Sequence, residues 1–456
     1  MTQPSFRLKR PEPSAEVRFS FNGRELSGLA GEPLSAALLA NGIHLVGRSF
    51  KYHRPRGIVS SGVEEPSALL QVGTGARITP NLPATEVRLY EGLTARSQNC
   101  YPSVAFDLGA INRLVAPFIP AGFYYKTFMG PRPDSWMFYE RFIRRAAGLG
   151  IAPIEDDPDE YDQTHHHCDV LVVGAGPAGM AAALTAGRSG LRVLLVERQP
   201  EPGGSLLAEP PDSSLRIDGQ EADRWLRETD RSLRSLANVT VLTGTNVFGR
   251  YRHNWYAAVQ TLRQPGAPGP GVRERLWKIR AKHVVFATGA IERMLVFANN
   301  DLPGVMLAGA VRDYAVRHGV AAGRRVVFVG NNDTIFRAAL DCREAGLNVV
   351  AVLDIRAAGD NRLSGACRAA GIPVAHRVEH LQASGGRRVS RLRFTSPQGR
   401  QSIACDVVGM SAGWAPAIHL HSQLEGTLRF DESSGAFLPI VDDGGPYSIG
   451  ACAGTM

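Results

Sequence analysis

The sequence predicts an α/β fold in which two βαβ units of one design follow a smaller domain of strands and a helix. Three observations lead to this prediction. An apolar run, a glycine-rich turn, an alanine-rich segment and a second apolar run succeed one another over 169–197. The same order returns over 325–354, so the unit is repeated within the chain. Before both units, residues 17–40 have the pattern of strand, tight turn, strand and helix.

The first predicted element is a β-hairpin. Val17 to Phe21 alternates between apolar and polar residues, Asn22-Gly23 is a strong hairpin signal, and Arg24 to Gly28 returns as a second strand. Gly31 to Ala40, GEPLSAALLA, then has the pattern of a helix. This order of elements resembles the start of a β-grasp domain, to which we assign residues 15–100.

The same order resembles the plant-type [2Fe–2S] ferredoxin module, in which a cluster loop of the form C-x4-C-x2-C follows the helix. The corresponding loop here, residues 48–70, reads RSFKYHRPRGIVSSGVEEPSALL and contains no cysteine. No cysteine occurs anywhere in residues 1–99. We therefore expect a ferredoxin-like domain without an iron–sulfur cluster.

Residues 101–165 form a predicted connector rich in aromatic side chains. Residues 136–147 have the spacing of an amphipathic helix, whose apolar face we expect to pack on a domain core. That face consists of Trp136, Tyr139, Phe142 and Ile143. The run His165-His166-His167-Cys168 suggests a metal site, but adjacent side chains of an extended segment point to opposite faces. We therefore expect no metal site.

The first βαβ unit has the residues that a dinucleotide needs at its pyrophosphate. The apolar run Val170 to Val173 is followed by Gly174, Gly176 and Gly179 at the spacing of a dinucleotide turn. These glycines allow, in order, the tight turn, the approach of backbone to pyrophosphate and close packing of helix on strand. The pyrophosphate is expected at the helix N-terminus, where free N–H groups favour an anion. The residues predicted at the pyrophosphate are Gly174, Gly176, Pro177, Ala178 and Gly179.

Glu197 ends the second strand, 18 residues after Gly179, where a carboxylate binds the hydroxyls of an adenosine ribose. A 2′-phosphate would meet like charge there, which favours NAD or FAD over NADP. Gly203, Gly204 and Ser205 form a glycine loop just beyond this acid, and Thr288-Gly289 follows a buried strand and is expected to line the site. No convergent general base or nucleophile is evident, so catalytic residues stay unassigned.

The second βαβ unit has a decayed glycine turn. Gly330 is retained, but Asn332 and Ile335 stand at the second and third glycine positions, where side chains obstruct a pyrophosphate and tight helix packing. Asp354 can still face a ribose. We expect a degenerate dinucleotide-binding domain that retains its fold without its ligand. The predicted boundaries are 15–100 for the β-grasp domain, 101–165 for the connector, 166–292 with 405–456 for the first dinucleotide-binding domain and 293–404 for the second.

The composition of the chain counts against several classes of function. The 456 residues carry a net charge of +8, but the arginines are scattered without interleaved aromatics, which disfavours nucleic-acid binding. No run of 18 apolar residues occurs, so no membrane span is expected. The six cysteines form no C-x-x-C, which excludes a thioredoxin-reductase-type dithiol and fits a reducing cytoplasm.

Taken together, the parts predict two glutathione-reductase-like dinucleotide-binding folds preceded by a ferredoxin-like β-grasp domain. The chain also contains the stretches GFYYKTFM, HCDVLVVGAGPAG, ATGAIER, NNDLPGVM and VGNND. With these stretches it resembles the α subunit of heterotetrameric sarcosine oxidase. It is similar in part to the α subunits of opine oxidase, hydrogen cyanide synthase and dye-linked proline dehydrogenase.

The resemblance implies a chain that holds NAD in its intact fold and works with other subunits, while FAD and FMN belong to the assembled complex. The implied reaction is oxidative demethylation of sarcosine, or another secondary amine, with peroxide as the oxygen product. The family's α subunits continue into a folate-binding region, so we expect this chain to be an N-terminal portion and not to be catalytically complete by itself.

Two alternatives stay open. The chain is an autonomous flavoenzyme, with FAD in the first fold and a pyridine nucleotide in the second, or it is a non-catalytic scaffold for subunit docking. The eroded second turn counts against the former, and the intact first turn counts against the latter.

Overall fold

The computed structural model describes residues 6–8, 15–114, 116–118, 122, 130, 132, 135–148, 150–211, 213–357, 361–424, 426–440 and 445–455. The chain divides into two compact units. Unit 1 comprises 1–158, 265–268 and 294–412, and unit 2 comprises 159–264, 269–293 and 413–456.

The first part of unit 1 is a five-stranded sheet with the order β2-β1-β7-β5-β6. The predicted hairpin is present, because β1 and β2 pair antiparallel up to Phe21 and Arg24. Asn22 and Gly23 both have positive φ, which a two-residue turn of this kind requires. Helix α1 follows, and all seven of its residues are buried. The elements are β1 (Glu16–Phe21), β2 (Arg24–Leu29), α1 (Leu34–Ala40), β3 (Gly47–Arg48), β4 (Pro55–Arg56), β5 (Leu69–Val72), β6 (Thr79–Pro83) and β7 (Leu93–Ser97).

The second part of unit 1 is a parallel five-stranded sheet with the order β17-β24-β18-β19-β20. It contains the second βαβ unit, β18-α7-β19. A three-stranded antiparallel sheet, β21-β22-β23, precedes the return strand β24. The elements are β17 (Val305–Leu307), α6 (Ala308–Val316), β18 (Arg325–Gly330), α7 (Thr334–Glu344), β19 (Asn348–Asp354), α8 (Arg362–Ala369), β20 (Val374–Ala375), β21 (Glu379–Gly385), β22 (Val389–Ser396), β23 (Gly399–Ala404) and β24 (Val407–Ser411).

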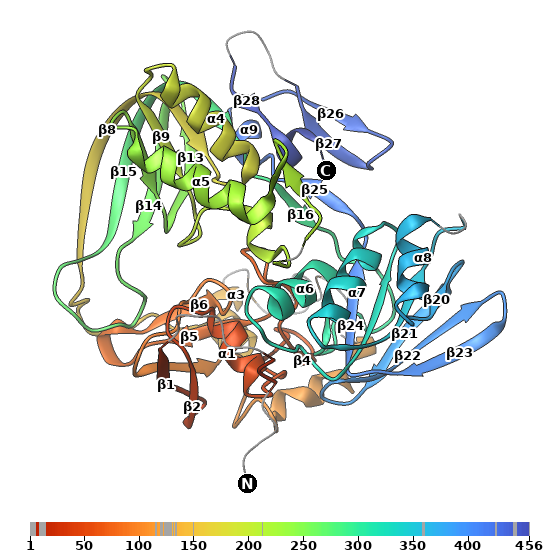
Figure 1. The fold of residues 1–456 in the computed structure, drawn as a ribbon. Coiled ribbons are helices and arrows are strands. Elements are labelled where there is room, and N and C mark those ends of the chain that lie inside the picture. Colours follow the sequence, from red (N-terminus) through yellow and green to blue (C-terminus); the bar gives the residue numbers. More distant parts are fainter. Residues whose placement is uncertain are drawn as a thin grey trace. The chain divides into compact units, whose positions relative to one another are not determined.

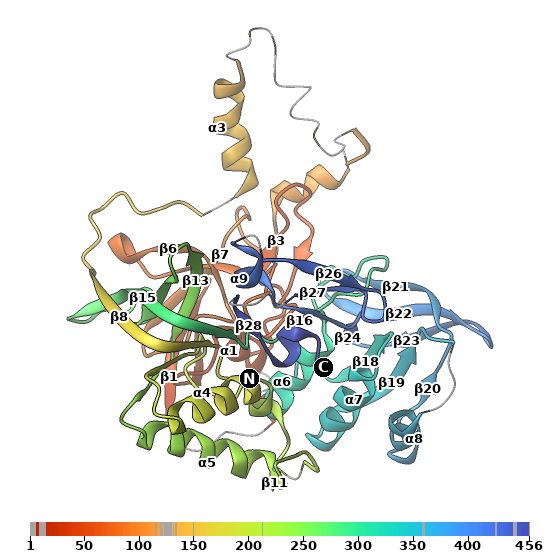
Figure 2. The ribbon, with the colours of Figure 1, turned by 90° about the horizontal axis from the view of Figure 1, so that it is seen from above.

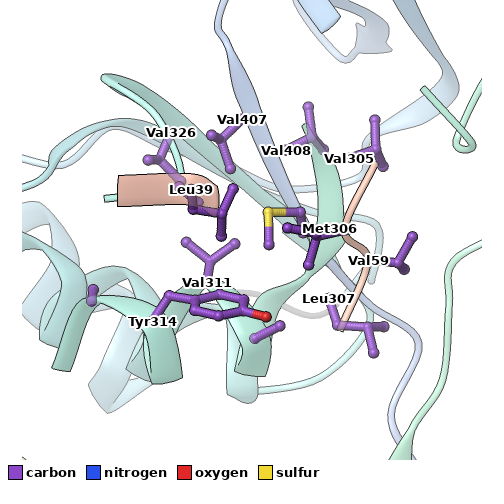
Figure 3. Close-up of a cluster of buried hydrophobic side chains, with 14 of the residues drawn as sticks. Leu39, Val59, Val305, Met306, Leu307, Val311, Tyr314, Val326, Val407 and Val408 are labelled. Carbon is purple, nitrogen blue, oxygen red and sulfur yellow. The ribbon is translucent and has the colours of Figure 1, made fainter. Parts of the chain in front are cut away.

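These two parts of unit 1 share one hydrophobic core (Figure 3). Leu39 of α1 packs among side chains of β17, α6 and β24, including Val311 and Tyr314. The buried Tyr314 hydroxyl donates to the Ser60 carbonyl oxygen at 2.9 Å and lies 2.8 Å from the Ser35 hydroxyl. The β-grasp helix is therefore part of the same core as the second nucleotide-type sheet.

Unit 2 is built on a seven-stranded sheet, in which the order β12-β9-β8-β15-β14-β13 is extended by β28 beside β15 (Figure 1). Strands β12, β9, β8, β15 and β28 are parallel, and β14 and β13 form an antiparallel extension. Helices α4 and α5 lie side by side against this sheet (Figure 2). In this unit β8, α4 and β9 follow one another along the chain, which is the strand–helix–strand order predicted for the first βαβ unit.

The elements of unit 2 are β8 (Glu160–Val173), α4 (Pro177–Arg188), β9 (Val193–Val196), β10 (Arg216–Ile217), β11 (Gln220–Glu221), α5 (Ala222–Ser235), β12 (Val239–Leu242), β13 (Thr245–Tyr251), β14 (Trp255–Thr261), β15 (Val272–Phe286), β16 (Ala290–Glu292), β25 (Trp414–Pro416), α9 (His419–Ser422), β26 (Leu428–Asp431), β27 (Ala436–Pro439) and β28 (Tyr447–Ser448).

Strands β8 and β15 are longer than their apolar cores. They pair in parallel from Glu160 and Val272 to Val173 and Phe286. The polar half of β8 contains the histidine run, whose exposure alternates along the strand as its backbone geometry requires. The two strands thus form one extended ladder, along which Asp162 of β8 pairs with Arg275 of β15.

Helix α3 (Trp136–Ala147) has the predicted bounds, but the prediction about its apolar face is wrong. Phe142 is 61% exposed, and no side chain of this helix that the structure describes is buried. The other three residues of the predicted face, Trp136, Tyr139 and Ile143, are half-buried. The aromatic connector motif, residues 122–129, lies outside the described residues except for Gly122.

Candidate dinucleotide site

The candidate site in unit 2 starts where β8 turns into α4. Gly174 has φ +100°, and a Cβ added there would come within 2.3 Å of the Ala287 carbonyl oxygen at the end of β15. A Cβ added to Gly179 would come within 1.9 Å of the Gly174 carbonyl oxygen. Both positions therefore require glycine, and the turn brings the helix N-terminus directly onto the strand end.

Gly176 differs from these two glycines, because a Cβ added to it would meet nothing within 4 Å. It is the N-cap residue of α4, and Pro177 occupies the first helical position, where no N–H is needed. The N–H groups of Ala178 and Gly179 belong to the first turn, which has no intrahelical partners for them. The turn thus presents open space in front of a helix N-terminus, as an anion requires.

Glu197 lies at the end of β9, and its carboxylate is fixed by two backbone N–H groups. Ala175 donates to Oε2 at 2.7 Å and Gln199 donates to Oε1 at 2.8 Å. Burial raises the pKa of Glu197, and these hydrogen bonds oppose the rise. A carboxylate held in this way beside the glycine turn is placed to accept hydrogen bonds from a ribose.

The predicted glycine loop lies against the same turn. The Gly203 N–H donates to the Ala175 carbonyl oxygen at 2.7 Å, and a Cβ added to Gly204 would come within 2.9 Å of the Gly176 Cα. Ser205 is exposed at the start of a short 3₁₀ helix, Gly204–Ala208. The structure therefore brings Gly203 and Gly204 to the turn, while Ser205 points to solvent.

Thr288 and Gly289 follow β15 and contact the C-terminal segment. The Thr288 hydroxyl donates to the Ala417 carbonyl oxygen at 2.7 Å, and the Gly289 carbonyl oxygen accepts from the Ala417 N–H at 3.0 Å. The Thr288 side chain is thus bound to the residue that follows β25, and the Thr288 backbone N lies at the turn, 3.4 Å from a Cβ added to Gly174.

Two residues outside the predicted site residues also contribute to the site. Ala175 connects the glycine turn to Glu197 and to the glycine loop, because its N–H donates to Glu197 and its carbonyl oxygen accepts from Gly203. Gly450, in the closing turn, lies so near Ala178 that an added Cβ would come within 2.8 Å of the Ala178 Cβ. The signal for Gly450 was its position after a short strand in the last residues of the chain.

A complete glycine turn, a buried acid at the next strand end and a closing turn against the same helix define unit 2 as an α/β dinucleotide-binding domain. The chain belongs to the pyridine nucleotide-disulphide oxidoreductase family, whose model matches residues 168–443, more than half of its length. It is therefore a member of an oxidoreductase family.

The predicted resemblance to sarcosine oxidase α subunits is confirmed. The chain is 48% identical to sarcosine oxidase subunit alpha of Rhizobium meliloti (strain 1021) over 426 residues, which cover 92% of this chain and 42% of that protein. It is 37% identical to the corresponding subunit of Corynebacterium sp. (strain U-96), with 99% of this chain and 42% of that protein covered. The chain thus spans less than half the length of these relatives.

One solved structure, the L-proline dehydrogenase from P. horikoshii, has a similar fold over 98% of this chain and 70% of that chain. Its TM-score is 0.64 at 20% sequence identity. This likeness supports the predicted α/β dinucleotide-binding fold.

The expectation of no iron–sulfur cluster is wrong as a reading of residues 14–100. The family model that matches them is that of a 2Fe-2S iron-sulfur cluster binding domain. The expectation rested on missing cysteines in the loop, and that signal does not identify the domain. Cys100 is the one cysteine of the matched residues, whereas such a cluster takes four thiolates. The thiols of this stretch alone do not supply the ligands of such a cluster.

Among the residues that the structure describes, no group of three or more His, Cys, Asp or Glu side chains is arranged to hold a metal ion. In the same residues no helix is both long and apolar enough to cross a membrane.

Proposed function

We propose that this chain holds NAD in the first fold and serves as the nucleotide-binding part of a sarcosine oxidase-type flavin amine oxidase. The observation that carries the proposal is the open space at Gly176 beside a Glu197 carboxylate fixed by Ala175 and Gln199. The kinship with sarcosine oxidase α subunits supports the choice of enzyme.

Each predicted residue except the exposed Ser205 has a role in this proposal. Gly174 and Gly179 let the helix approach the strand, Gly176 leaves room for the pyrophosphate, and Pro177 and Ala178 begin the helix whose N–H groups bind it. Glu197 accepts the ribose hydroxyls, and its negative charge disfavours the 2′-phosphate of NADP. Gly203, Gly204 and the backbone of Thr288-Gly289 shape the surrounding wall. We assign no catalytic residue to this chain.

The bond-breaking step is proposed for the assembled enzyme. Sarcosine, dioxygen and water would give glycine, formaldehyde and hydrogen peroxide, or a folate one-carbon product in place of formaldehyde. A bound flavin, FAD or FMN, would supply the two-electron oxidation of the C–N bond. The other subunits would bind the secondary amine, and this chain would contribute the nucleotide site and docking surfaces.

An autonomous FAD- and NAD(P)H-dependent enzyme is the second candidate, because family membership includes pyridine nucleotide-linked oxidoreductases. The third is a scaffold without a nucleotide. An absorption spectrum, with mass analysis of the cofactor released on denaturation, separates the three. We expect a chain that releases NAD and carries no flavin of its own. FAD in the absence of NAD would overturn the proposal in favour of the second candidate, and release of no nucleotide would favour the third.

A further inference from the structure

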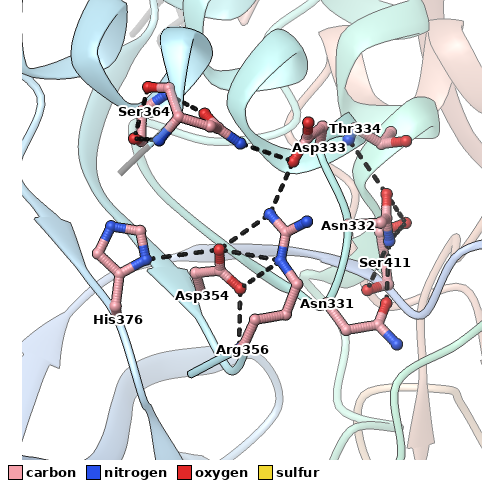
Figure 4. A network of polar contacts seen from close by, with 10 residues as sticks. Asn331, Asn332, Asp333, Thr334, Asp354, Arg356, Ser364, His376 and Ser411 are labelled. Carbon is pink, nitrogen blue, oxygen red and sulfur yellow. Dashed lines mark hydrogen bonds and ion pairs between the residues drawn. The ribbon is translucent and has the colours of Figure 1, made fainter. Parts of the chain in front are cut away.

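The second βαβ unit of the chain has the same parts as the dinucleotide site, but its side chains form a network of polar contacts with one another (Figure 4). Strand β18 ends at Gly330, α7 starts at Thr334, and β19 ends at Asp354. The family to which the chain belongs implies a pyridine nucleotide, and in an autonomous enzyme of this design the second fold would hold it. The residues present do not fit that group.

The pyrophosphate end of this unit is occupied by Asn332. Its Oδ1 accepts a hydrogen bond from the Thr334 N–H at 3.1 Å, and its Nδ2 donates to the Ser411 hydroxyl at 3.0 Å. The first-turn N–H that a phosphate oxygen would need is therefore already bound. In the first fold, the matching position is Gly176, which opens onto free space.

The ribose end is occupied by Arg356. Its Nε donates to Asp354 Oδ1 at 3.0 Å, its Nη2 donates to Oδ2 at 2.9 Å, and its backbone N–H also donates to Oδ1 at 2.9 Å. Asp354 is 2% exposed, and His376 Nδ1 lies 3.5 Å from its Oδ2. The Asp354 carboxylate thus has a guanidinium and an imidazole against its oxygens, whereas the Glu197 carboxylate accepts from the backbone N–H groups of Ala175 and Gln199.

A third side chain holds this arrangement together. The Asp333 carboxylate accepts from Arg356 Nη2 at 2.7 Å and from Asn361 Nδ2 at 2.9 Å, through the same oxygen. Asp333 precedes the first turn of α7, where a carboxylate repels a phosphate that would otherwise be attracted by the helix dipole. The ring of Phe336 lies under the guanidinium, 6.0 Å from its centre.

We infer that the second fold is a self-occupied nucleotide site, in which Asn332 takes the place of the pyrophosphate and Arg356 the place of the ribose. Pyridine nucleotides do not bind there. The fold is retained because its sheet and helices form one core with the β-grasp domain.

Hydrogen exchange of the whole chain, freed of bound nucleotide, with and without millimolar NADH tests this inference at the residues concerned. In the wild type we expect nucleotide to slow exchange around 174–180 and to leave 330–336 unchanged. Slower exchange at 330–336 in the wild type would overturn the inference. Failure of the response at 174–180 would count against the proposed function alone, because the second fold is monitored by its own peptides.

A variant that empties the site gives the positive test. The triple variant N332G/D333A/R356A is expected to bind NADH at 330–336 at least about tenfold more tightly than the wild type, a change of ~1.4 kcal/mol. Arg343→Ala, which removes an exposed cation from the last turn of the same helix, is the matched control and should change nothing. A folded triple variant that binds no more tightly would overturn the inference. If the triple variant does not fold, NADH binding at 330–336 is measured with R356A and compared with the wild type. Tighter binding to R356A is then the expected result, and equal binding would overturn the inference.

Discussion

The Glu197 carboxylate accepts a hydrogen bond from the Ala175 N–H at 2.7 Å, which ties the end of β9 to the glycine turn after β8. Both residues come from one βαβ unit, so the contact is local in the chain. It fixes the acid and the turn in one geometry before any ligand arrives, and such preorganisation lowers the entropic cost of binding.

Filling the open space at Gly176 is expected to abolish nucleotide binding without harming the fold. A valine side chain at Gly176 would occupy the space in front of the helix N-terminus, where its Cβ meets no protein atom within 4 Å. We expect G176V to bind NAD at least about tenfold more weakly, ~1.4 kcal/mol, by calorimetric titration. The thermal midpoint should stay close to that of the wild type.

The matched control for this variant is Gly365→Val. Gly365 lies within α8, and a Cβ added there also meets nothing within 4 Å. The substitution is chemically the same but is far in sequence from the turn, so NAD affinity should not change. Equal affinities of G176V and the wild type would show that the nucleotide does not pass in front of Gly176.

Replacing the Glu197 carboxylate with an amide is expected to reduce the preference for NAD over NADP. E197Q removes the charge that disfavours a 2′-phosphate, and we expect the ratio of the two affinities to fall by about tenfold. An amide also cannot accept from both Ala175 and Gln199, which costs ~1–3 kcal/mol of stability. Glu201→Gln, at an exposed acid in the following turn, should leave the ratio unchanged. An unchanged ratio in E197Q would contradict the role given to Glu197.

Two histidines, the buried His318 and the half-buried His44, make unit 1 sensitive to mild acid. Burial lowers the pKa of His318 to about 4, although Asp313 opposes the shift, and burial together with Arg388 lowers the pKa of His44 to about 3. In the unfolded chain both have a pKa near 6.5. Their contribution to stability is therefore complete above pH 6.5 and is lost as pH falls, because the unfolded state takes up protons that the native state excludes.

The expected slope is ~1.4 kcal/mol per pH unit for each histidine that is protonated only in the unfolded state. Urea unfolding of H318Q at several pH values between 6.5 and 4 should show a pH dependence smaller than that of the wild type by this amount. His380→Gln, at a side chain that is 80% exposed, is the control and should retain the full slope. A wild-type slope in H318Q would mean that His318 is protonated in the folded chain.

Glu65 is expected to be essential for the β-grasp loop. Its carboxylate accepts four backbone hydrogen bonds of 2.7–2.9 Å from Val59, Ser60, Ser67 and Ala68, and the side chain is buried. E65Q would leave two of these N–H groups facing an amide donor, and each unsatisfied group costs ~1–3 kcal/mol. Urea unfolding should show this loss, whereas Glu25→Gln, exposed in β2, should have little effect. A loss no larger than that of the control would contradict the role of Glu65.

Structural features that depend on residues close together in the chain are predicted well from the sequence. The glycine turn, Glu197 and the Asn22-Gly23 hairpin each depend on residues close together in the chain, so spacing alone indicates their geometry. Glycine identity also carries information, because Gly174 and Gly179 lie where a Cβ would meet backbone.

What depends on distant contacts was not predictable in the same way. The contact of Gly450 with Ala178 joins residues far apart in the chain, and the pairing of Arg356 with Asp333 requires knowing how α7 lies beside β19. The polar half of β8 has no apolar periodicity, so its strand was visible only through its partner β15. Phe142 of α3 was predicted to pack on a core but is exposed, because the periodicity of a helix does not say how deeply its apolar face is buried.

The most direct test of the central claim is the nucleotide content of the purified chain. Mass analysis after denaturation should find NAD from the wild type, in a molar ratio approaching one per chain, and from the Gly365→Val control, but not from G176V. Release of FAD in place of NAD, or of the same NAD from G176V as from the wild type, would contradict the assignment of NAD to the first fold.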